Sequence, residues 1–210
     1  MELTTYTVGP FIARINIEPD LDAMDPRDDD YLGTIEVFYN SAPFMERAVE
    51  IFGKRTNDAL EILVGGGVVW TGPGGQRPWL GLERYRHGLD AYAVCRQGNF
   101  PDRRWDVAPI VGFWSPHPDA PALTKARSLH REKMDRNAEQ LLCKEAADDL
   151  TVWNQFVQGD VWGYQATLLD ADGNEIAEDS CWGYFGLDRV EQEAEALVQH
   201  WRKKYEKETV

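Results

Sequence analysis

Apolar and polar residues alternate near the start of the chain in a pattern that predicts two strands. In residues 11–17 the alternation begins at Ile15, and residues 31–39 are rich in β-branched and aromatic side chains. A period of two places apolar side chains on one face of a sheet, so both segments suit half-buried strands. We therefore expect an N-terminal strand pair.

Apolar residues recur at three- and four-residue intervals in later stretches, which predicts helices near residues 42–56, 136–157 and 188–206. Ser41 suits the N-cap of the first helix, and basic residues at the end of the third complement the helix dipole. The core-facing stripes are Phe44, Ala48, Ile51 and Phe52 in the first helix, Leu142, Ala146, Leu150, Trp153 and Phe156 in the second, and Val190, Ala194, Leu197 and Trp201 in the third.

A hairpin is predicted near the end of the chain. Residues 161–169 and 175–185 are typical of strands, and the turn between them contains Gly173, which tolerates the positive φ of a tight turn. The middle, residues 65–117, differs in character because it has two glycine-rich loops and short apolar strands. Between residues 76 and 106 six arginines stand against four acidic residues, which we attribute to charge complementarity inside the protein.

These patterns together predict an α+β fold in a single domain, residues 1–210. The N-terminal strand pair and the C-terminal hairpin would build a mainly antiparallel sheet, with the three helices packed on one side. The Gly/Arg-rich residues 65–117 would form an insertion or an extension of the sheet.

The chain has 36 acidic and 22 basic residues, a formal net charge of −14. This charge argues against direct binding to nucleic acid or to an anionic membrane. It is compatible with a basic protein partner, and equally with solubility alone. Three well-separated cysteines, and a start without the basic and apolar regions of a signal peptide, favour a cytoplasmic protein.

Seven carboxylates lie in residues 18–30 with one cation, Arg27, between the two predicted N-terminal strands. Like charges repel at short range, so the run is either a solvated turn or an acidic surface for a basic partner. B-DNA carries about one negative charge per ~1.7 Å of its axis, and a similar density of carboxylates could occupy the nucleic-acid channel of a basic protein. The candidate partner-binding residues are Glu18, Asp20, Asp22, Asp25, Asp28, Asp29, Asp30, Asp148 and Asp149, which Glu145, Asp170, Asp172, Glu175, Glu178 and Asp179 could extend.

Catalytic signatures are missing from the sequence. The four histidines are scattered without a metal-binding pair, and neither glycine-rich loop has the spacing of a phosphate-binding motif. Cys181 lies in an aromatic segment that suits an inert strand residue. The acidic run lacks the ligand spacing of a calcium loop. We therefore expect no catalytic residue, metal or cofactor.

Two segments resemble an uncharacterised protein family of phages and plasmids. The first is Asp25-Pro26-Arg27 followed by Leu32-Gly33-Thr34, and the second is GDVWGY at residues 159–164 with DSCWGYFG at residues 179–186. Family members usually have Trp-Asp-Asn where this chain has Asp29-Asp30-Tyr31. The resemblance implies a small intracellular protein of a mobile genetic element, acting in the host cytoplasm, and carries over no catalytic or binding residue.

Three functions stay open. The leading hypothesis is a non-enzymatic, anti-defence inhibitor that binds a basic, nucleic-acid-handling host protein. Mimicry of nucleic-acid charge is one way in which it could bind. The second is an accessory binding module whose exposed aromatics would be Trp70, Trp79, Trp105, Trp114 and Trp162. The third is an enzyme with a dispersed site made of Arg77, Arg84, Arg86, His87 and Asp90.

Overall fold

The structure, a computed structural model, describes residues 2–28, 32–132 and 135–205. These residues form helices and antiparallel strands, which confirms the predicted α+β class.

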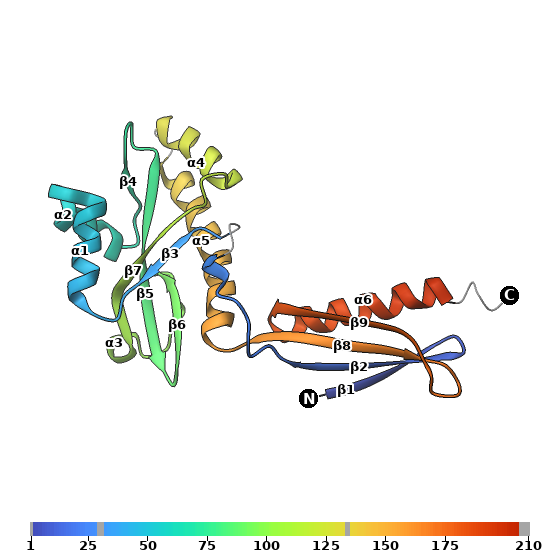
Figure 1. Ribbon diagram of the computed structural model, residues 1–210. Coiled ribbons are helices and arrows are strands. Elements are labelled where there is room, and N and C mark those ends of the chain that lie inside the picture. The colour runs from blue at the N-terminus through green and yellow to red at the C-terminus, as the bar shows by residue number, and fades with distance from the viewer. Residues whose placement is uncertain (1, 29–31, 133–134, 206–210) are drawn as a thin grey trace. The chain divides into compact units, whose positions relative to one another are not determined.

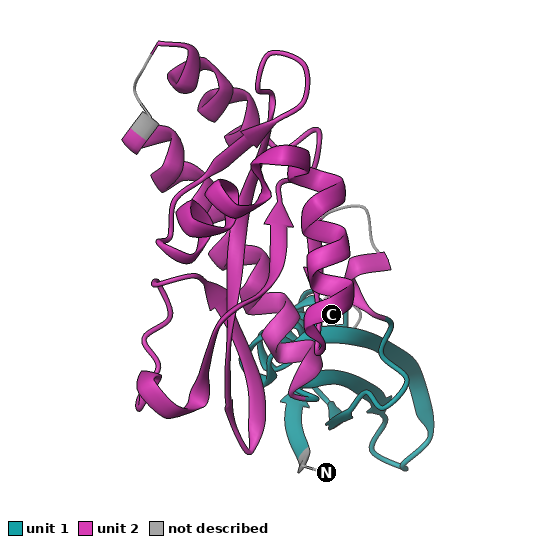
Figure 2. Ribbon diagram, turned by 90° about the vertical axis from the view of Figure 1, so that its left-hand side faces the viewer, with its two compact units in different colours: residues 1–24, 159–210 teal, residues 25–158 magenta. Residues whose placement is uncertain are grey.

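The chain divides into two compact units (Figure 2). Unit 1 consists of residues 1–24 and 159–210, and unit 2 consists of residues 25–158. In sequence, unit 2 is therefore inserted between the two parts of unit 1. Folding as one domain over residues 1–210 stays a prediction.

Unit 1 is a four-stranded antiparallel sheet with one helix packed on it (Figure 1). Its elements are β1 (Glu2–Val8), β2 (Phe11–Pro19), β8 (Val161–Leu169), β9 (Glu175–Phe185) and α6 (Leu187–Tyr205). The strand order is β1-β2-β8-β9. The predicted C-terminal hairpin and last helix are thus confirmed.

The core of unit 1 follows the two periodicities of its elements. Every three or four residues α6 buries a side chain, and alternate residues of β2 and β8 meet them. The residues of these three elements that meet in this core are Val190, Ala194, Val198, Trp201 and Tyr205 with Ala13, Ile15, Tyr164, Ala166 and Leu168. The hairpin turn closes where the Gly173 N–H donates to the Asp170 carbonyl at 3.1 Å, with Gly173 at φ 85°.

One predicted pairing is wrong. The neighbours of β2 are β8 and β1. The sequence analysis did not identify β1 as a strand. The second predicted strand appears as β3 (Thr34–Val37), which belongs to unit 2 and pairs with β7 (Val107–Ser115). Local periodicity identified both segments as strands, but it contains no information about their partners.

Unit 2 is built on a five-stranded antiparallel sheet. Its other strands are β4 (Val69–Thr71), β5 (Arg77–His87) and β6 (Leu89–Val94). The order is β3-β7-β5-β4, and β6 also pairs with β5. The central segment, residues 65–117, therefore provides four of the five strands.

Helices cover both faces of this sheet (Figure 1). One side carries α1 (Ser41–Phe52) and α2 (Thr56–Val64), and the other carries α4 (Pro121–Arg131) and α5 (Asp135–Val157). The short helices are η1 (Pro26–Asp28), η2 (Gly53–Arg55) and α3 (Arg103–Asp106).

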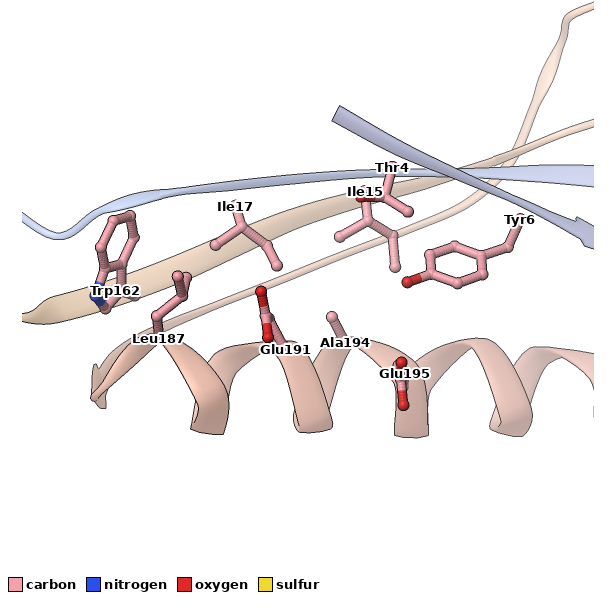
Figure 3. Close-up of a pocket in the computed structure, with 9 residues that line it drawn as sticks. All are labelled: Thr4, Tyr6, Ile15, Ile17, Trp162, Leu187, Glu191, Ala194 and Glu195. Carbon is pink, nitrogen blue, oxygen red and sulfur yellow. The ribbon is translucent and has the colours of Figure 1, made fainter. Parts of the chain in front are cut away.

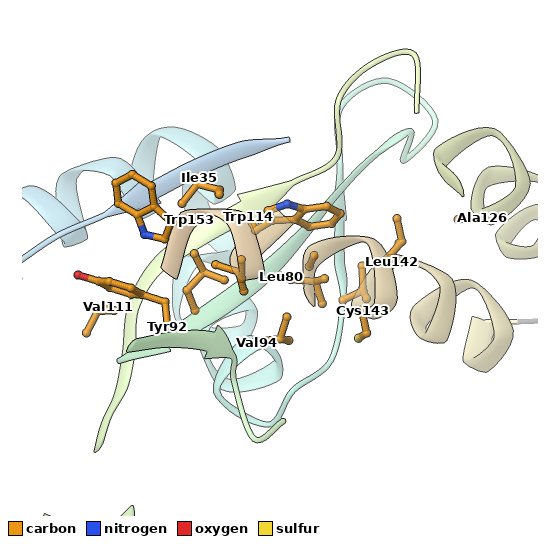
Figure 4. Packing of buried hydrophobic residues seen from close by; sticks show 14 of the residues in the cluster. Ile35, Leu80, Tyr92, Val94, Val111, Trp114, Ala126, Leu142, Cys143 and Trp153 are labelled. Atoms are coloured by element: carbon orange, nitrogen blue, oxygen red, sulfur yellow. The ribbon is translucent and has the colours of Figure 1, made fainter. Parts of the chain in front are cut away.

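Adjacent residues of one strand explain the two layers. On β7, Phe113 packs toward α1 and α2, whereas the next residue, Trp114, packs toward α4 and α5. On β5, Trp79 and Leu80 divide in the same way. Figure 4 shows the layer that contains Leu80 and Trp114. The predicted packing of helices on one side therefore describes unit 1, while unit 2 has a second layer because both sheet faces are apolar.

Helix α5 also protects the free edge of β6. The Asn154 side chain accepts a hydrogen bond from the Tyr92 N–H at 2.7 Å and donates one to the Tyr92 carbonyl at 2.9 Å. A side-chain amide thus takes the place of a neighbouring strand, which blocks this edge against pairing with another chain.

Candidate functional site

The structure divides the acidic run of residues 18–30 between the two units. Glu18, at the end of β2, belongs to unit 1 together with Asp20 and Asp22, whereas Asp25 and Asp28 open unit 2. Asp29 and Asp30 lie outside the described residues. The run is therefore not one continuous surface of one unit.

Asp25 is engaged locally. Its carboxylate accepts the Arg27 backbone N–H at 2.9 Å and the guanidinium Nη2 at 2.6 Å. The hydrogen bond from Arg27 is the largest cause of the lowered pKa of Asp25. The same guanidinium stacks over the Trp153 ring, with 4.2 Å between its carbon and the ring centroid. This pair links residues 25–27 to α5, which gives the Asp-Pro-Arg sequence a structural role.

Asp149 requires a correction, because it is buried and does not belong to an exposed partner surface. Only 8% of Asp149 is exposed. Its Oδ2 accepts the Gly33 N–H at 2.8 Å and the Trp114 indole N–H at 2.7 Å. Burial, the largest influence, raises the pKa of this carboxyl. Asp148, in contrast, is exposed and lies 3.2 Å from the Lys144 ammonium.

Gly33 shows why Leu-Gly-Thr follows the acidic run. A Cβ at Gly33 would lie 2.6 Å from the Ser115 carbonyl oxygen and 2.8 Å from Asp149 Oδ2. Real Cβ atoms do not approach that closely, so a residue without a side chain is needed for the contact. Together with Asp25 and Arg27, this glycine anchors the start of unit 2.

The acidic excess is concentrated in unit 1. This unit has 16 acidic and six basic residues, a formal charge of −10, whereas the larger unit 2 has 20 and 16, a charge of −4. The exposed carboxylates of the hairpin turn, β9 and α6 are Asp172, Glu175, Glu178, Asp179, Asp188, Glu191, Glu193 and Glu195, here called the β9–α6 acidic surface. Four of these residues were not among the sequence candidates.

Carboxylates of two elements act on one buried tyrosine. After burial, the largest cause, the charges of Asp179 on β9 and Glu193 on α6 both raise the pKa of Tyr164. Clustered charges of one sign add to a common negative potential.

Unit 1 also contains a cavity of about 350 Å³ between its sheet and α6. Apolar walls come mainly from Ile15 and Ile17, and aromatic walls from Tyr6 and Trp162. Figure 3 shows the Glu191 carboxylate directed from α6 toward the strands, and the Tyr6 hydroxyl directed into the same space. The full lining is Thr4, Tyr6, Ile15, Ile17, Trp162, Leu187, Glu191, Ala194 and Glu195.

The chemistry of this cavity suits a cation with an apolar stem. Glu191 and Glu195 supply negative charge, and among the described residues no basic side chain lines the cavity to neutralise it. The Trp162 indole N–H donates to Asp160 Oδ1 at 2.6 Å, which orients the ring. Aromatic faces attract ammonium and guanidinium groups, and lysine or arginine stems pack well on apolar walls.

The second motif of the family resemblance, at residues 159–164 and 179–186, also has a structural role. A Cβ at Gly163 on β8 would meet the Trp182 ring at 2.1 Å, so the indole on β9 lies directly over this glycine. The strand register shifts beside this contact, and Gly183 has φ 82°. Cys181 is exposed, whereas Cys95 and Cys143 are buried. The tryptophan and its two glycines therefore specify an irregular strand pair.

The five tryptophans of the second hypothesis do not form one exposed patch. Trp79 and Trp114 are 2% and 0% exposed and lie in cores on opposite faces of the sheet. Trp162 belongs to unit 1, and Trp70 is partly buried beside the His130 ring at 4.3 Å. Trp105 is 79% exposed. Two of the five therefore stabilise the fold instead of offering a surface.

The dispersed enzyme site is also not assembled. Arg77 begins β5, whereas Arg84, Arg86 and His87 lie at its other end. At that end Arg86 pairs with Asp90 at 3.5 Å, and His87 with Asp106 at 3.4 Å. The Arg86 and His87 side chains are exposed there, and their acidic partners lie on β6 and α3. Within the described residues, no group of three His, Cys, Asp or Glu side chains is arranged to hold a metal ion.

Comparison with known proteins gives no relative: no family model, no curated protein and no solved structure matches the chain. Kinship with the phage and plasmid family therefore stays a prediction. In the described part of the chain, no helix combines the length and the apolar character that crossing a bilayer requires.

Proposed function

We propose that the protein is a non-enzymatic binding protein whose unit 1 engages the cationic surface of a basic partner. The observation that carries this proposal is the cavity beneath α6, where Glu191 and Glu195 meet aromatic walls inside a unit of charge −10. A lysine or arginine of the partner would insert its stem between the sheet and α6. Its charge would then face the two carboxylates.

The β9–α6 acidic surface would act at longer range. Clustered charges of one sign steer an oppositely charged partner and raise the association rate, and salt weakens this effect. The partner class we propose is a nucleic-acid-handling protein, because its cationic surface normally meets a dense row of phosphates. From the family resemblance we further propose a mobile-element protein that inhibits a host defence protein in the host cytoplasm.

A defined cationic probe tests the cavity. A capped tetra-arginine peptide is titrated into the protein in a calorimeter, at low and at high NaCl concentration. Glu191→Gln combined with Glu195→Gln should weaken binding about tenfold, equivalent to about 1.4 kcal/mol. The matched control is Glu46→Gln with Asp58→Asn, which removes the same charge from exposed positions of α1 and α2 in unit 2. Equal weakening by both variants, or no effect of salt, would contradict the proposal.

The partner class needs a separate test. Proteins are captured from a bacterial lysate on the wild type and on the Glu191→Gln, Glu195→Gln variant, and elution with duplex DNA is compared. The proposal predicts a basic protein that the wild type retains, the variant loses and DNA displaces. Captured proteins that DNA does not displace would contradict nucleic-acid mimicry, while the peptide titration would still decide whether the cavity of unit 1 binds cations.

A further inference from the structure

Unit 2 contains a cavity of opposite character, with a volume of about 440 Å³. Two arginines, Arg77 and Arg127, line it together with the hydroxyl-bearing residues Thr34, Thr71 and Ser115, and the remaining wall is largely proline and leucine. In the part of the chain that the structure describes, no acidic residue lines this cavity. In a protein with 36 acidic residues, such a lining calls for an explanation.

Local contacts orient both arginines beside the same cavity. Arg127 Nε donates to the carbonyl of Gln76, the residue before Arg77, at 2.9 Å. The Arg77 guanidinium stacks on the Trp79 ring at 4.4 Å, and its Nε donates to Ser115 Oγ at 3.4 Å. Both arginines thus use Nε to fix their orientation. The terminal Nη groups are the ones that could face a ligand.

Neither arginine has a carboxylate partner among the residues that the structure describes. Elsewhere in unit 2, Arg27 binds Asp25, Arg47 binds Glu36 and Arg103 binds Glu83. What distinguishes Arg77 and Arg127 is that two arginines without a carboxylate partner line the same cavity.

The first turn of α4 strengthens the positive potential. Leu123 in that turn lines the cavity, so the positive end of the helix dipole lies beside it. Arg127 and Gln76 also line an adjoining cavity of about 400 Å³, in which the charge of Arg131 is offset by Glu132. Arg127 thus lies where the two cavities meet.

We propose that the Arg77–Arg127 cavity binds a small organic anion. A phosphate or carboxylate would accept hydrogen bonds from both guanidinium groups and from the hydroxyls of Thr34 and Ser115, since the arginine fork fits both anions. The apolar or ring portion of the ligand would pack against the prolines and Leu123. The cavity volume lies within the range of about 300–1,000 Å³ typical of small-molecule sites. This site is independent of the cation-binding cavity proposed for unit 1.

Calorimetric titration of the full chain with three probes tests the proposal. The probes are adenosine monophosphate, inorganic phosphate and benzoate. Tighter binding of adenosine monophosphate than of phosphate is expected, because only the former fills the apolar wall. Binding of benzoate alone would assign the site to carboxylates, within the same proposal. Failure of all three probes to bind at millimolar concentration would overturn it.

Variants locate the binding. Arg77→Gln with Arg127→Gln should weaken the best probe at least tenfold, whereas Arg104→Gln, which removes an exposed arginine stacked on Trp105, should leave it unchanged. Arg127→Lys keeps the charge but loses the fork, so it should weaken binding to an intermediate degree. If the double variant does not fold, as its circular dichroism would show, Arg127→Lys alone decides. Unchanged affinity in Arg127→Lys, or equal loss in Arg104→Gln, would overturn the proposal.

Discussion

The two units use charge in opposite ways. Every ion pair among the described residues joins side chains of unit 2. Unit 1 has a formal charge of −10 and exposes its carboxylates on β9 and α6. Charge that is paired and buried serves a fold, whereas charge of one sign left at a surface creates a long-range potential. The comparison therefore separates structural carboxylates from those available to a partner.

The largest effect should come from Glu83, which is 1% exposed. Its carboxylate accepts hydrogen bonds from both terminal nitrogens of Arg103 and from the backbone N–H groups of Arg96 and Gly98. Glu83→Ala leaves these donors unpaired and should lower the free energy of unfolding by about 3–5 kcal/mol, measured by urea denaturation. Glu195→Ala in unit 1 should change it by less than about 0.5 kcal/mol. Similar losses of unfolding free energy in both variants would contradict the distinction between structural carboxylates in unit 2 and exposed carboxylates in unit 1.

Asp149 should have the next largest effect. Asp149→Ala leaves the Gly33 N–H and the Trp114 indole N–H without their acceptor, and an unsatisfied buried donor costs about 1–3 kcal/mol. We expect a loss of about 2–3 kcal/mol in the same denaturation experiment. The control is Asp148→Ala, one residue away on the exposed side of α5. An unchanged stability in Asp149→Ala would refute the anchoring role of this carboxylate.

Asp25 and Asp149 should give pH dependences of opposite sign. The pKa of Asp149 is raised above 3.8, so its contribution to stability is present below pH 3.8 and is lost as pH rises through the folded-state value. The pKa of Asp25 is lowered, so its contribution is present above pH 3.8 and is lost as pH falls through the folded-state value. The stability difference between wild type and Asp149→Asn should therefore shrink as pH rises, and that for Asp25→Asn should grow. Two slopes of the same sign would contradict the assigned environments.

Cysteine labelling should leave stability unchanged and still distinguish the units. Cys181 of unit 1 is exposed, whereas burial raises the pKa of Cys95 in unit 2 to about 12. Because the thiolate is the reactive form, iodoacetamide at mildly alkaline pH should modify Cys181 first. Mass spectrometry of digested samples measures the order. Early modification of Cys95 or Cys143 would show that the core of unit 2 opens readily.

The sequence predicted elements with strong local periodicity and missed those that depend on distant residues. The β8–β9 hairpin and α6 are confirmed because turn chemistry and a helical stripe are local signals. Strand β5 was missed because Pro78, Gly81 and Glu83 interrupt its apolar pattern. Glu83 is tolerated there only because Arg103, twenty residues later, satisfies it.

The candidate sites show the same limit. The sequence analysis proposed Asp25 and Asp149 as parts of a partner-binding surface. In the structure Asp149 is a buried anchor and Asp25 is bound to Arg27. Glu191 and Glu195 are spaced one helical turn apart beside the apolar stripe of α6, which was a usable signal. The aromatic walls opposite them come from β1 and β8, and no local pattern predicts that meeting.

The most direct test of the central claim is a nitrogen-15 NMR titration of the protein with the tetra-arginine peptide. The account predicts saturable shifts of the Trp162 indole N–H and of the Tyr6 and Ile17 amides around the cavity of unit 1, with unit 2 amides largely unmoved. Amide shifts that spread evenly over the acidic residues of both units, or that concentrate in unit 2, would contradict it.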